Sequence, residues 1–347
     1  MSSVVRLQDI ADLAGVDKGT VSHVLNRRPK SFLLRAETRE RIERVASELG
    51  YCRNELAASI SSRHSRVLAF VTSDMGIIDY TGRVQNGVFD AACELDYTVS
   101  LHHLNADNAE AVLQKILGWR CAGVIFHVSE LESPALLSII TRLSELGTPY
   151  GFVNQSHSEA LAITTDDRTG IIEAMRHLRQ AGSKYPAFVS ELRSSHKTAA
   201  AYIRCREEAY FEGMQDNFAR AEPLILRCSG SLQGTADHAQ YERLLDEAQA
   251  SGVDALLCIS DLVAFKLLQS ALLRGLKVPQ QLRLVGFGDL NIGRVCRPAL
   301  STIAQDFESM GRQMCETIVA KIEKKYKGKN NNKQIPVKLI LRESSPA

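Results

Sequence analysis

The chain has 347 residues, of which 45% are hydrophobic and 24% are charged. These values are ordinary for a soluble globular protein, and at roughly 150 residues per domain the length predicts about two domains. No apolar run approaches the roughly 18 to 20 residues that span a bilayer. The first residues also lack the basic and then apolar order of a secretory signal. Composition therefore argues against global disorder, a membrane-spanning helix and a small disulfide-stabilised scaffold.

The spacing of the cysteines and the distribution of charge restrict the class of protein further. No two of the eight cysteines lie within four residues, which argues against a zinc ribbon and a redox pair, and we expect buried free thiols. Residues 1–66 hold 12 Lys and Arg against 8 Asp and Glu, whereas the remainder holds 30 against 32. This basic head is weak evidence for a nucleic-acid partner. Because no metal-ligand cluster, phosphate-binding glycine loop or nucleophile elbow is found, we expect no metal, no cofactor and no enzymatic activity.

The first 50 residues predict three short helices. Apolar residues recur at helical spacing over 7–14, and Gly15 ends this helix because glycine tolerates the left-handed conformation of a tight turn. Asp17 is placed to cap a second helix over 18–25, and a third is expected over 37–49. A helix, a glycine-containing turn and a second helix form the helix-turn-helix pattern, in which the second helix enters the major groove of DNA.

Four stretches of this head resemble the lactose-repressor (LacI) family of bacterial transcription regulators: Leu7–Val16, Gly19–Asn26, Glu37–Ile42 and Glu48–Tyr51. Side chains that hydrogen-bond to base edges read sequence, whereas small hydroxyls and amides suit phosphate oxygens. The resemblance implies that bases are read at three positions, namely Lys18, Gly19 and His23. It implies phosphate contacts at a second set, namely Thr20, Ser22, Asn26, Thr38, Tyr51 and Asn54.

The head also departs from the family pattern. His23 stands where arginine is common, and Gly19 has no side chain at a usual reading position, so we expect an operator unlike the common family sites. Residues 27–35 form a longer loop than usual, with four basic side chains. Contacts from this loop to phosphate and a simple solvent-exposed excursion are equal alternatives.

Residues 54–66 match the family's hinge. A helix of two turns is marginal in water without a partner. The resemblance implies that it folds where two subunits meet over DNA, with Ile60 wedged into the minor groove and Ala57 permitting close packing. The alternative is that Leu56 and Ile60 are core contacts.

From residue 66 onward, short apolar strands alternate with amphipathic helices in two series, a pattern that predicts two α/β lobes with parallel doubly wound sheets and a cleft between them. Strands are expected at 67–71, 98–101, 124–126, 150–153, 187–189, 223–227, 255–259, 283–285 and 337–341. Helices are expected at 84–95, 109–117, 134–146, 169–181, 202–218, 241–251 and 262–274. Trp119 is expected to be buried near the lobe surface, and 321–333 to form a helix end and loop.

The resemblance continues through 285–289 and 298–306, and implies a body like the periplasmic sugar-binding proteins. We therefore expect a small all-α helix-turn-helix head over 1–53, a hinge helix and linker over 54–66, and a two-lobed periplasmic-binding-protein-like body over 67–347. The chain is expected to cross between the lobes near residues 165 and 304.

The same resemblance implies that the body supplies a dimer interface and closes around an effector, a sugar or sugar derivative. Arg206 is the strongest candidate contact, because a guanidinium presents a fork of donors to ligand oxygens. Asp261 has an alternative role as the N-cap of the helix that follows it. Gly288 stands where many relatives have a ligand-binding Asp, so the effector stays open. The candidate contacts are Ser73, Asp74, Tyr80, Asn154, Arg206, Asp261, Asp289 and Gln305.

Together these features predict a cytoplasmic, nucleoid-associated homodimer without a membrane partner. We expect it to bind a pseudo-palindromic operator as a regulator, most simply a repressor, under the control of a small molecule. The alternatives are a cytosolic solute-binding protein, a regulator governed by a protein corepressor, and an enzyme acting in the α/β cleft.

Overall fold

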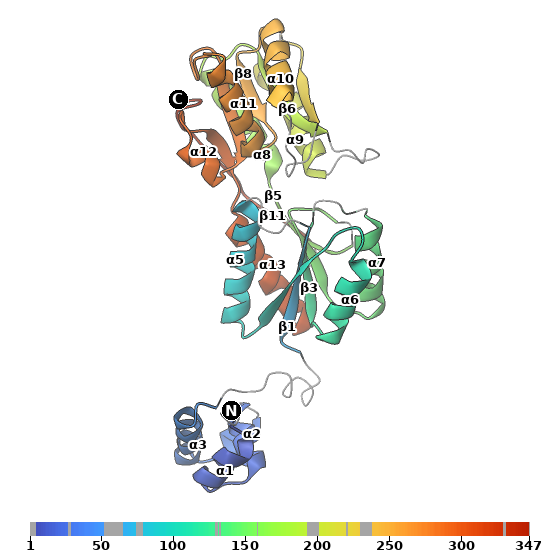
Figure 1. The fold of residues 1–347 in the computed structure, drawn as a ribbon, viewed down its shortest axis with the longest axis vertical. Helices are drawn as coiled ribbons and strands as arrows, with labels where there is room; N and C mark the ends of the chain where they lie inside the picture. Colours follow the sequence, from blue (N-terminus) through green and yellow to red (C-terminus); the bar gives the residue numbers. More distant parts are fainter. Residues whose placement is uncertain are drawn as a thin grey trace. The chain divides into compact units, whose positions relative to one another are not determined.

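The computed structural model describes residues 5–26, 29–51, 65–73, 79–128, 131, 133–157, 159–192, 201–219, 221–229, 238–328 and 331–346. The chain divides into two compact units, Met1–Arg66 and Val67–Ala347 (Figure 1). We call them unit 1 and unit 2. The predicted hinge positions Asn54, Ala57 and Ile60 and the candidate Asp74 lie outside the described residues.

Unit 1 is a three-helix domain. Its helices are α1 (Leu7–Ala14), α2 (Lys18–Leu25) and α3 (Ala36–Glu48), and the 3-10 helix η1 (Pro29–Leu33) lies between the last two. The predicted bounds of the first two helices are confirmed. As expected, Gly15 ends α1 in the left-handed conformation, with φ 64°. A small core holds the three helices together: Ile10, Ala11, Ala14, Val21, Val24, Ile42 and Ala46.

Unit 2 contains two α/β lobes, as predicted. Lobe 1 is built on a sheet with strand order β11-β5-β4-β3-β1-β2, in which every neighbouring pair is parallel. Its strands are β1 (Val67–Thr72), β2 (Thr98–His103), β3 (Gly123–His127), β4 (Tyr150–Val153), β5 (Leu161–Thr165) and β11 (Asn332–Ile335). Its helices are α5 (Asp79–Glu94), α6 (Ala109–Gly118), α7 (Pro134–Glu145) and α13 (Phe307–Ile322).

Lobe 2 is built on a second sheet, with strand order β12-β10-β9-β8-β6-β7. Its strands are β6 (Pro186–Leu192), β7 (Ile225–Ser229), β8 (Ala255–Cys258), β9 (Arg283–Gly288), β10 (Ser301–Ala304) and β12 (Lys338–Ile340). Its helices are α8 (Asp167–Gln180), α9 (Ala201–Asn217), α10 (His238–Ala250), α11 (Asp261–Leu273) and α12 (Asn291–Val295). The edge strand β12 runs antiparallel to β10, a departure from the all-parallel expectation.

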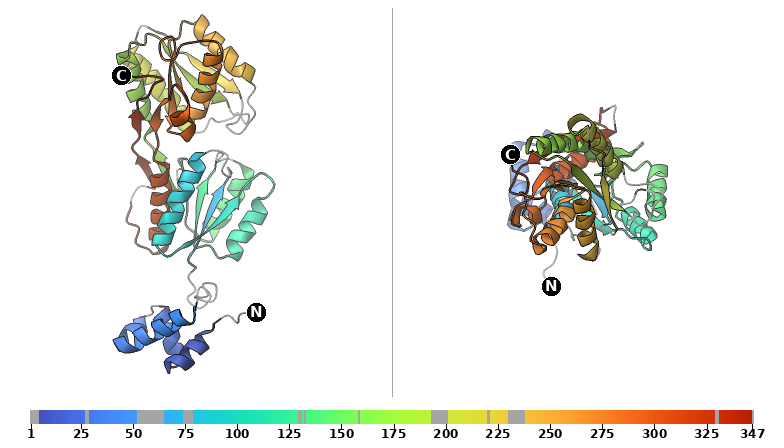
Figure 2. Two further views of the ribbon diagram at one scale, coloured as in Figure 1. Left: turned by 60° about the vertical axis from the view of Figure 1, so that its left-hand side comes forward. Right: turned by 90° about the horizontal axis from the view of Figure 1, so that it is seen from above.

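The two faces of the lobe 1 sheet are covered by different helix pairs. Helices α5 and α13 cover one face, and α6 and α7 the other. Figure 2 shows α13, from the carboxy-terminal part of the chain, beside α5, from the start of the lobe. The α5–α13 contact needs glycine: a Cβ on Gly87 would lie 2.0 Å from the Glu308 carbonyl oxygen, and one on Gly311 would lie 2.1 Å from that of Val84.

The chain passes between the two sheets three times, after β5, after β10 and after β11. The third passage was not expected, because 321–333 was predicted to be a helix end and loop. Residues 332–335 instead form β11, which pairs with β5 in lobe 1. The prediction for Trp119 is also wrong, because this side chain is 52% exposed just after α6. Most described cysteines are buried free thiols, as expected: Cys121, Cys228, Cys258, Cys296 and Cys315.

Candidate functional site

Asp17 caps the amino-terminal end of α2. Its carboxylate accepts a hydrogen bond from the Thr20 backbone N–H at 2.9 Å and another from the Thr20 hydroxyl. These two bonds lower the pKa of Asp17, the side-chain bond most. Lys18 and Gly19 in the first turn are exposed. A Cβ on Gly19 would lie 2.8 Å from Asp17 Oδ1, so the missing side chain leaves room for the cap.

The remaining predicted DNA contacts of α2 lie farther along the helix and are half-buried. The Asn26 amide donates to the Ser22 carbonyl oxygen at 2.7 Å and to the Ser22 hydroxyl at 3.2 Å, which orients both polar groups. His23 Nδ1 is buried without a hydrogen-bond partner. Thr38 and Tyr51 are half-buried on and just after α3.

A hydrogen-bond chain joins the two lobes where the chain first passes between them. The Gln305 amide donates to Thr165 Oγ1 at 2.7 Å and to Asn154 Oδ1 at 3.4 Å. The Thr165 hydroxyl donates in turn to Asp167 Oδ1 at 2.5 Å. Two predicted effector contacts, Asn154 and Gln305, are therefore brought together.

Arg206 continues this chain into lobe 2. The residue is 4% exposed. Its guanidinium donates to Asp167 Oδ2 at 2.7 Å and to the Ile259 carbonyl oxygen at 2.6 Å, and lies 3.5 Å from the centroid of the Phe287 ring. A buried guanidinium requires partners of this kind, since an unpaired charge is costly away from water. Asp167 thus connects the lobe 1 contacts to Arg206.

Asp261 is fully buried at the start of α11. Thr302 Oγ1 donates to its Oδ1, and the Leu290 backbone N–H donates to its Oδ2, both at 2.6 Å. Burial raises the pKa of this carboxyl to about 6, although the two hydrogen bonds act in the opposite direction. The alternative role as an N-cap is wrong, because Ser260 caps α11 by accepting from the Val263 N–H.

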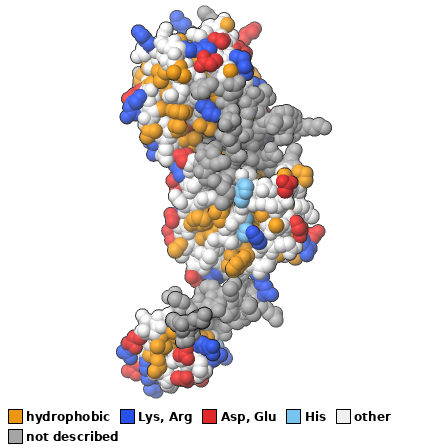
Figure 3. All heavy atoms as spheres, viewed as in Figure 1, with side chains coloured by type: hydrophobic (Ala, Val, Ile, Leu, Met, Phe, Trp, Pro, Cys, Tyr) orange, Lys and Arg blue, Asp and Glu red, His pale blue; other side chains and the backbone are white. Residues whose placement is uncertain are grey.

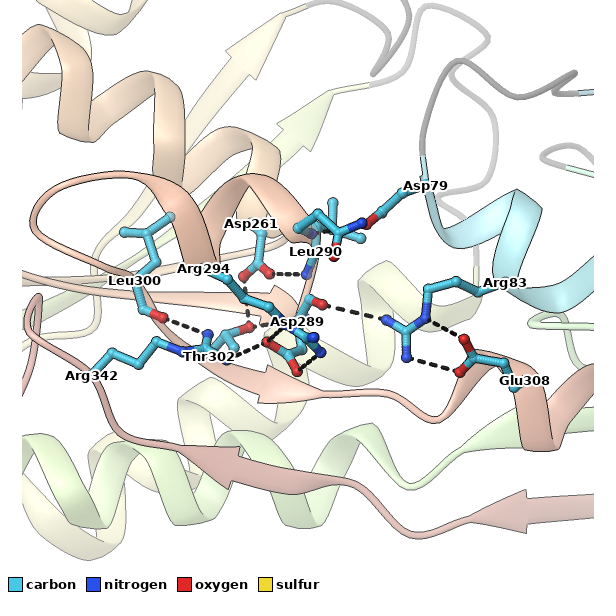
Figure 4. Close-up of polar contacts among 11 residues, drawn as sticks. Asp79, Arg83, Asp261, Asp289, Leu290, Arg294, Leu300, Thr302, Glu308 and Arg342 are labelled. Carbon is cyan, nitrogen blue, oxygen red and sulfur yellow. Dashed lines mark hydrogen bonds and ion pairs between the residues drawn. The ribbon is translucent and has the colours of Figure 1, made fainter. Parts of the chain in front are cut away.

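Asp289 lies in the turn between β9 and α12, with φ 54°. Its carboxylate forms ion pairs with Arg294 and Arg342, each at 2.6 Å (Figure 4). Burial disfavours the ionised carboxylate, but the hydrogen bonds from Arg294 and Arg342 outweigh it and lower the pKa of Asp289. This predicted effector contact therefore already holds two basic partners within lobe 2.

Two residues of α5 hold that turn from lobe 1, and we call them the α5 clamp. Asp79 Oδ2 accepts from the Asn291 backbone N–H at 2.8 Å. Arg83 donates to the Asp289 carbonyl oxygen at 3.3 Å and forms a bidentate pair with Glu308, with both bonds at 3.0 Å. Figure 4 shows Arg83 between the Asp289 carbonyl and Glu308. The clamp joins α5 and α13 of lobe 1 to lobe 2.

The sequence reasoning missed His127, the last residue of β3. The side chain is 5% exposed, and its Nδ1 has no hydrogen-bond partner. Its ring lies edge-on to Tyr80 at 5.5 Å, and its carbonyl oxygen accepts from the Ser73 N–H at 3.4 Å. Burial lowers the pKa of His127 to about 4, so the ring is neutral at pH 7. A polar residue directly after the apolar run 124–126 was the available signal.

His127, Ser73 and Tyr80 thus form a second group near the carboxyl ends of β1 and β3, the edge at which doubly wound sheets bind ligands. Among the described residues, no group of three or more His, Cys, Asp or Glu is placed to hold a metal ion. In the same part of the chain, no helix is long and apolar enough to cross a membrane.

Comparison with known families accounts for both units. Residues 6–54 match the family of bacterial regulatory proteins of the lacI type, and residues 175–345 match the periplasmic binding protein-like domain. The first match covers the three helices of unit 1, and the second covers most of lobe 2 together with α13 and β11 of lobe 1.

Relatives and solved structures are similar over nearly the whole chain. The HTH-type transcriptional regulator DegA of Bacillus subtilis is 25% identical over 98% of this chain and 97% of its own. GalR of Escherichia coli, another HTH-type transcriptional regulator, is 23% identical over 90% and 88%. The fold matches the Lac repressor dimer bound to operator and the anti-inducer ONPF, with a TM-score of 0.80, 22% identity, and coverage of 99% of this chain and 100% of that one.

These matches agree with the four stretches of unit 1 that resemble the LacI family and with the two-lobed α/β body. The relatives carry the names of transcription regulators rather than of enzymes. The chain combines a helix-turn-helix domain of the lacI family of bacterial regulatory proteins with a periplasmic-binding-protein-like domain.

Proposed function

We propose that this regulator is a repressor that binds a pseudo-palindromic operator as a homodimer, under the control of a small molecule bound between the lobes of unit 2. The observation that carries the proposal is the capped α2, which presents Lys18 and Gly19 at its exposed start. Such a helix inserts its amino-terminal residues into the major groove. The division we propose is a DNA-binding head over 1–53, a hinge over 54–66 and a body over 67–347. Because bacterial DNA lies in the cytoplasm, we propose that the regulator acts there.

Within the head, Lys18 and His23 are the side chains we propose to read bases. The proposed phosphate contacts are Thr20, Ser22, Asn26, Thr38, Tyr51 and Asn54. Gly19 lets the helix start approach the groove closely, and Ala57 and Ile60 retain their proposed hinge roles.

Exposed apolar side chains on lobe 2 support a dimer. Leu273 at the end of α11 is 78% exposed, and Val295 at the end of α12 is 73% exposed. On the face drawn in Figure 3, apolar side chains gather on lobe 2 over α11 and α12. An isologous interface would bury these side chains on both subunits. The two-fold symmetry of such a dimer would match the two half-sites of a pseudo-palindromic operator.

For the effector, the described groups favour a neutral, hydroxyl-rich compound. Asp167 balances the charge of Arg206, and His127 is neutral. These side chains therefore offer a ligand hydrogen bonds rather than a net charge. His127 Nδ1 is a buried ring nitrogen without a hydrogen-bond partner, so a ligand hydroxyl can supply the missing bond. The known ligands of similar folds agree, because one solved structure is a CelR–cellobiose complex with a TM-score of 0.70 and another regulator was solved with bound ribose. The other proposed contacts are Ser73, Asp74, Tyr80, Asn154, Asp261, Asp289 and Gln305.

A second candidate is a regulator controlled by a protein corepressor. It is favoured by the lobe 2 carboxylates, since both oxygens of Asp261 and of Asp289 already accept hydrogen bonds from the protein. Gly288, directly before Asp289, adds no side chain. A ligand would have to displace protein partners to use these two groups.

The DNA proposal is tested with duplexes that the purified chain enriches from a random library. A dimer with six to ten phosphate contacts should lose a factor of about 10³ to 10⁵ in affinity between 50 and 200 mM salt. Lys18→Ala and His23→Ala should change the enriched sequence, whereas Ser22→Ala should weaken all duplexes alike. Failure of the wild type to bind any duplex at low salt would refute the proposal.

The effector proposal is tested by calorimetry with a panel that includes cellobiose and ribose. Binding by the wild type and a loss of at least tenfold in His127→Phe would support a small-molecule effector at this edge. Arg142→Ala is the control, because that arginine pairs with Glu145 on the outer helix α7. No heat with any sugar, together with capture of a protein partner that alters DNA binding, would favour the second candidate.

A further inference from the structure

The 3-10 helix η1 displays two large apolar side chains outside the core of unit 1. Phe32 is 71% exposed and Leu33 is 86% exposed, whereas Ser31 on one side is 4% exposed. On the other side, Leu34 packs against the unit 1 core, and its N–H donates to the Ser31 carbonyl oxygen at 3.2 Å. We call Phe32 and Leu33 the η1 tip. Because the residues on both sides are anchored, the tip is held out from the domain by its own backbone.

The chemistry around the tip fits a polyanion. Residues 27–36 contain four Lys and Arg and no Asp or Glu. Lys30, within η1, and Arg35, directly before α3, are both exposed. The start of α3 adds to this, since the side chain of its N-cap Arg35 forms no capping hydrogen bond and the positive end of a helix dipole favours a nearby anion.

The position of the tip is continuous with the helix that we propose to read DNA. Helix η1 packs against α2 and begins three residues after Asn26, the C-cap of α2. A duplex that receives α2 in its major groove must therefore pass close to η1. Apolar side chains contact thymine methyl groups, sugars and unstacked base steps, and basic side chains beside them hold phosphates.

We infer that the η1 tip is a second DNA contact, which binds the duplex beside the half-site read by α2 and lengthens the site. Lys30 and Arg35 bind phosphate, and Phe32 and Leu33 contact the sugars or bases of the adjoining groove. Of the two alternatives for loop 27–35, we thus favour the contact with DNA over the solvent-exposed excursion. The inference rests on the proposed DNA binding.

The test uses the full chain and two fluorescent duplexes: the site enriched by the wild type, and the same site trimmed by six base pairs at each end. The variants are the double substitution Phe32→Ala with Leu33→Ala, and the single substitution Lys30→Gln. Leu13→Ala is the matched control, because Leu13 is an exposed apolar residue of α1, 65% exposed. Circular dichroism and thermal unfolding establish that every variant is folded.

We expect the double variant to bind the long duplex roughly tenfold or more weakly than the wild type, and to lose the wild type's preference for the long duplex over the trimmed one. Its dependence on salt should be unchanged, because no charge is removed. Lys30→Gln should instead reduce the salt slope by about one per protomer. Leu13→Ala should match the wild type.

Equal affinity of the double variant and the wild type on both duplexes would overturn the inference while leaving the proposed function intact. A double variant that fails to dimerise without DNA in sedimentation, but binds DNA normally at high protein concentration, would overturn it in favour of a second copy as the occupant. If the wild type bound no duplex at all, the inference and the proposed function would both fail.

Discussion

At the scale of single residues, the lobe interface depends on polar groups that are buried and paired. Asp167 is the centre of this arrangement, since one carboxylate oxygen accepts from Thr165 and the other from Arg206. His127 is the contrast, because it is as deeply buried but leaves one ring nitrogen without a partner. A satisfied group contributes to the fold, whereas an unsatisfied one marks a place where a ligand can supply the missing bond.

The first prediction concerns Asp167. Replacing it with alanine leaves the Arg206 guanidinium buried and without its carboxylate, so the free energy of unfolding should fall by about 3 to 5 kcal/mol. The neighbouring Arg168→Ala breaks an exposed pair with Glu212 and should cost less than about 1 kcal/mol. Urea unfolding of both variants measures this difference. Similar small losses in the two variants would contradict the role given to Asp167.

The second prediction concerns the pH dependence set by His127. Its pKa is about 4 in the folded chain and 6.5 when unperturbed, so the unfolded chain binds the proton more readily. The stability should therefore be constant above about pH 6.5 and fall as the pH drops toward 4. From these values, His127 should make unfolding about 2 kcal/mol easier at pH 5 than at pH 7. The free energy of unfolding of His127→Phe, measured with urea at both pH values, should not show this decrease of about 2 kcal/mol.

At the scale of secondary-structure elements, the close contact of α5 and α13 holds lobe 1 together. Gly87 and Gly311 each face a backbone carbonyl of the other helix. Gly82, also on α5, has open space where a Cβ would stand. The three glycines therefore have different roles, although all three lie within helices, where glycine is intrinsically unfavourable.

The third prediction follows from these glycines. Gly311→Ala and Gly87→Ala should each lower the free energy of unfolding by about 2 to 3 kcal/mol, because the added methyl group forces the two backbones apart. Gly82→Ala should instead raise it by up to about 1 kcal/mol, since alanine favours the helix and nothing is displaced. Thermal and urea unfolding report the sign. Stabilisation by Gly311→Ala would show that the helices do not pack this closely.

Most elements were predictable from local patterns, and the failures have local causes. Strand β4 was predicted at its observed bounds, because an apolar run and flanking turn residues coincide there. Helix α13 was predicted only at its end, near residue 321, although its buried residues, among them Met310, Met314 and Ile318, follow helical spacing. Strand β11 gives no such signal, because its sequence Asn-Lys-Gln-Ile is mostly polar and three of its residues are exposed. A polar edge strand is recognised only once its partner is placed.

Several residues of the candidate site could be identified from the sequence, but the hydrogen bonds that join them could not. Asn154, Arg206 and Gln305 were identified as residues, yet their link through Thr165 and Asp167 depends on the passage between lobes. The partners of Asp289 show the same limit, because Arg342 lies 53 positions away in sequence. Such pairings are set by topology, which local patterns do not contain.

At the scale of the whole molecule, the α5 clamp couples the two lobes at a point away from the three chain passages. Asp79 and Arg83 in lobe 1 hold backbone groups of Asn291 and Asp289 in lobe 2. A ligand that favours one lobe arrangement must keep or break these bonds, and its differential affinity for the two arrangements sets the response.

The fourth prediction tests this coupling by hydrogen exchange. Asp79→Ala frees the Asn291 amide, and Arg83→Ala removes the bond to the Asp289 carbonyl, so amides in residues 288–295 should exchange faster in both variants. Glu94→Ala is the control, because Glu94 pairs with Arg312 wholly within lobe 1. Mass spectrometry of that peptide reports the rates. Unaltered exchange in both clamp variants would show that the clamp does not hold the lobes.

The late position of α13 and β11 in the chain has a consequence for biosynthesis. Lobe 1 begins at β1, yet part of the helical cover on one face of its sheet comes from residues 307–322, and one of its two edge strands comes from residues 332–335. As the polypeptide leaves the ribosome, nearly all of lobe 2 emerges before these pieces exist. The lobe whose translation begins first is thus completed last, and until then the apolar side chains that α13 buries stay exposed and can require chaperone protection.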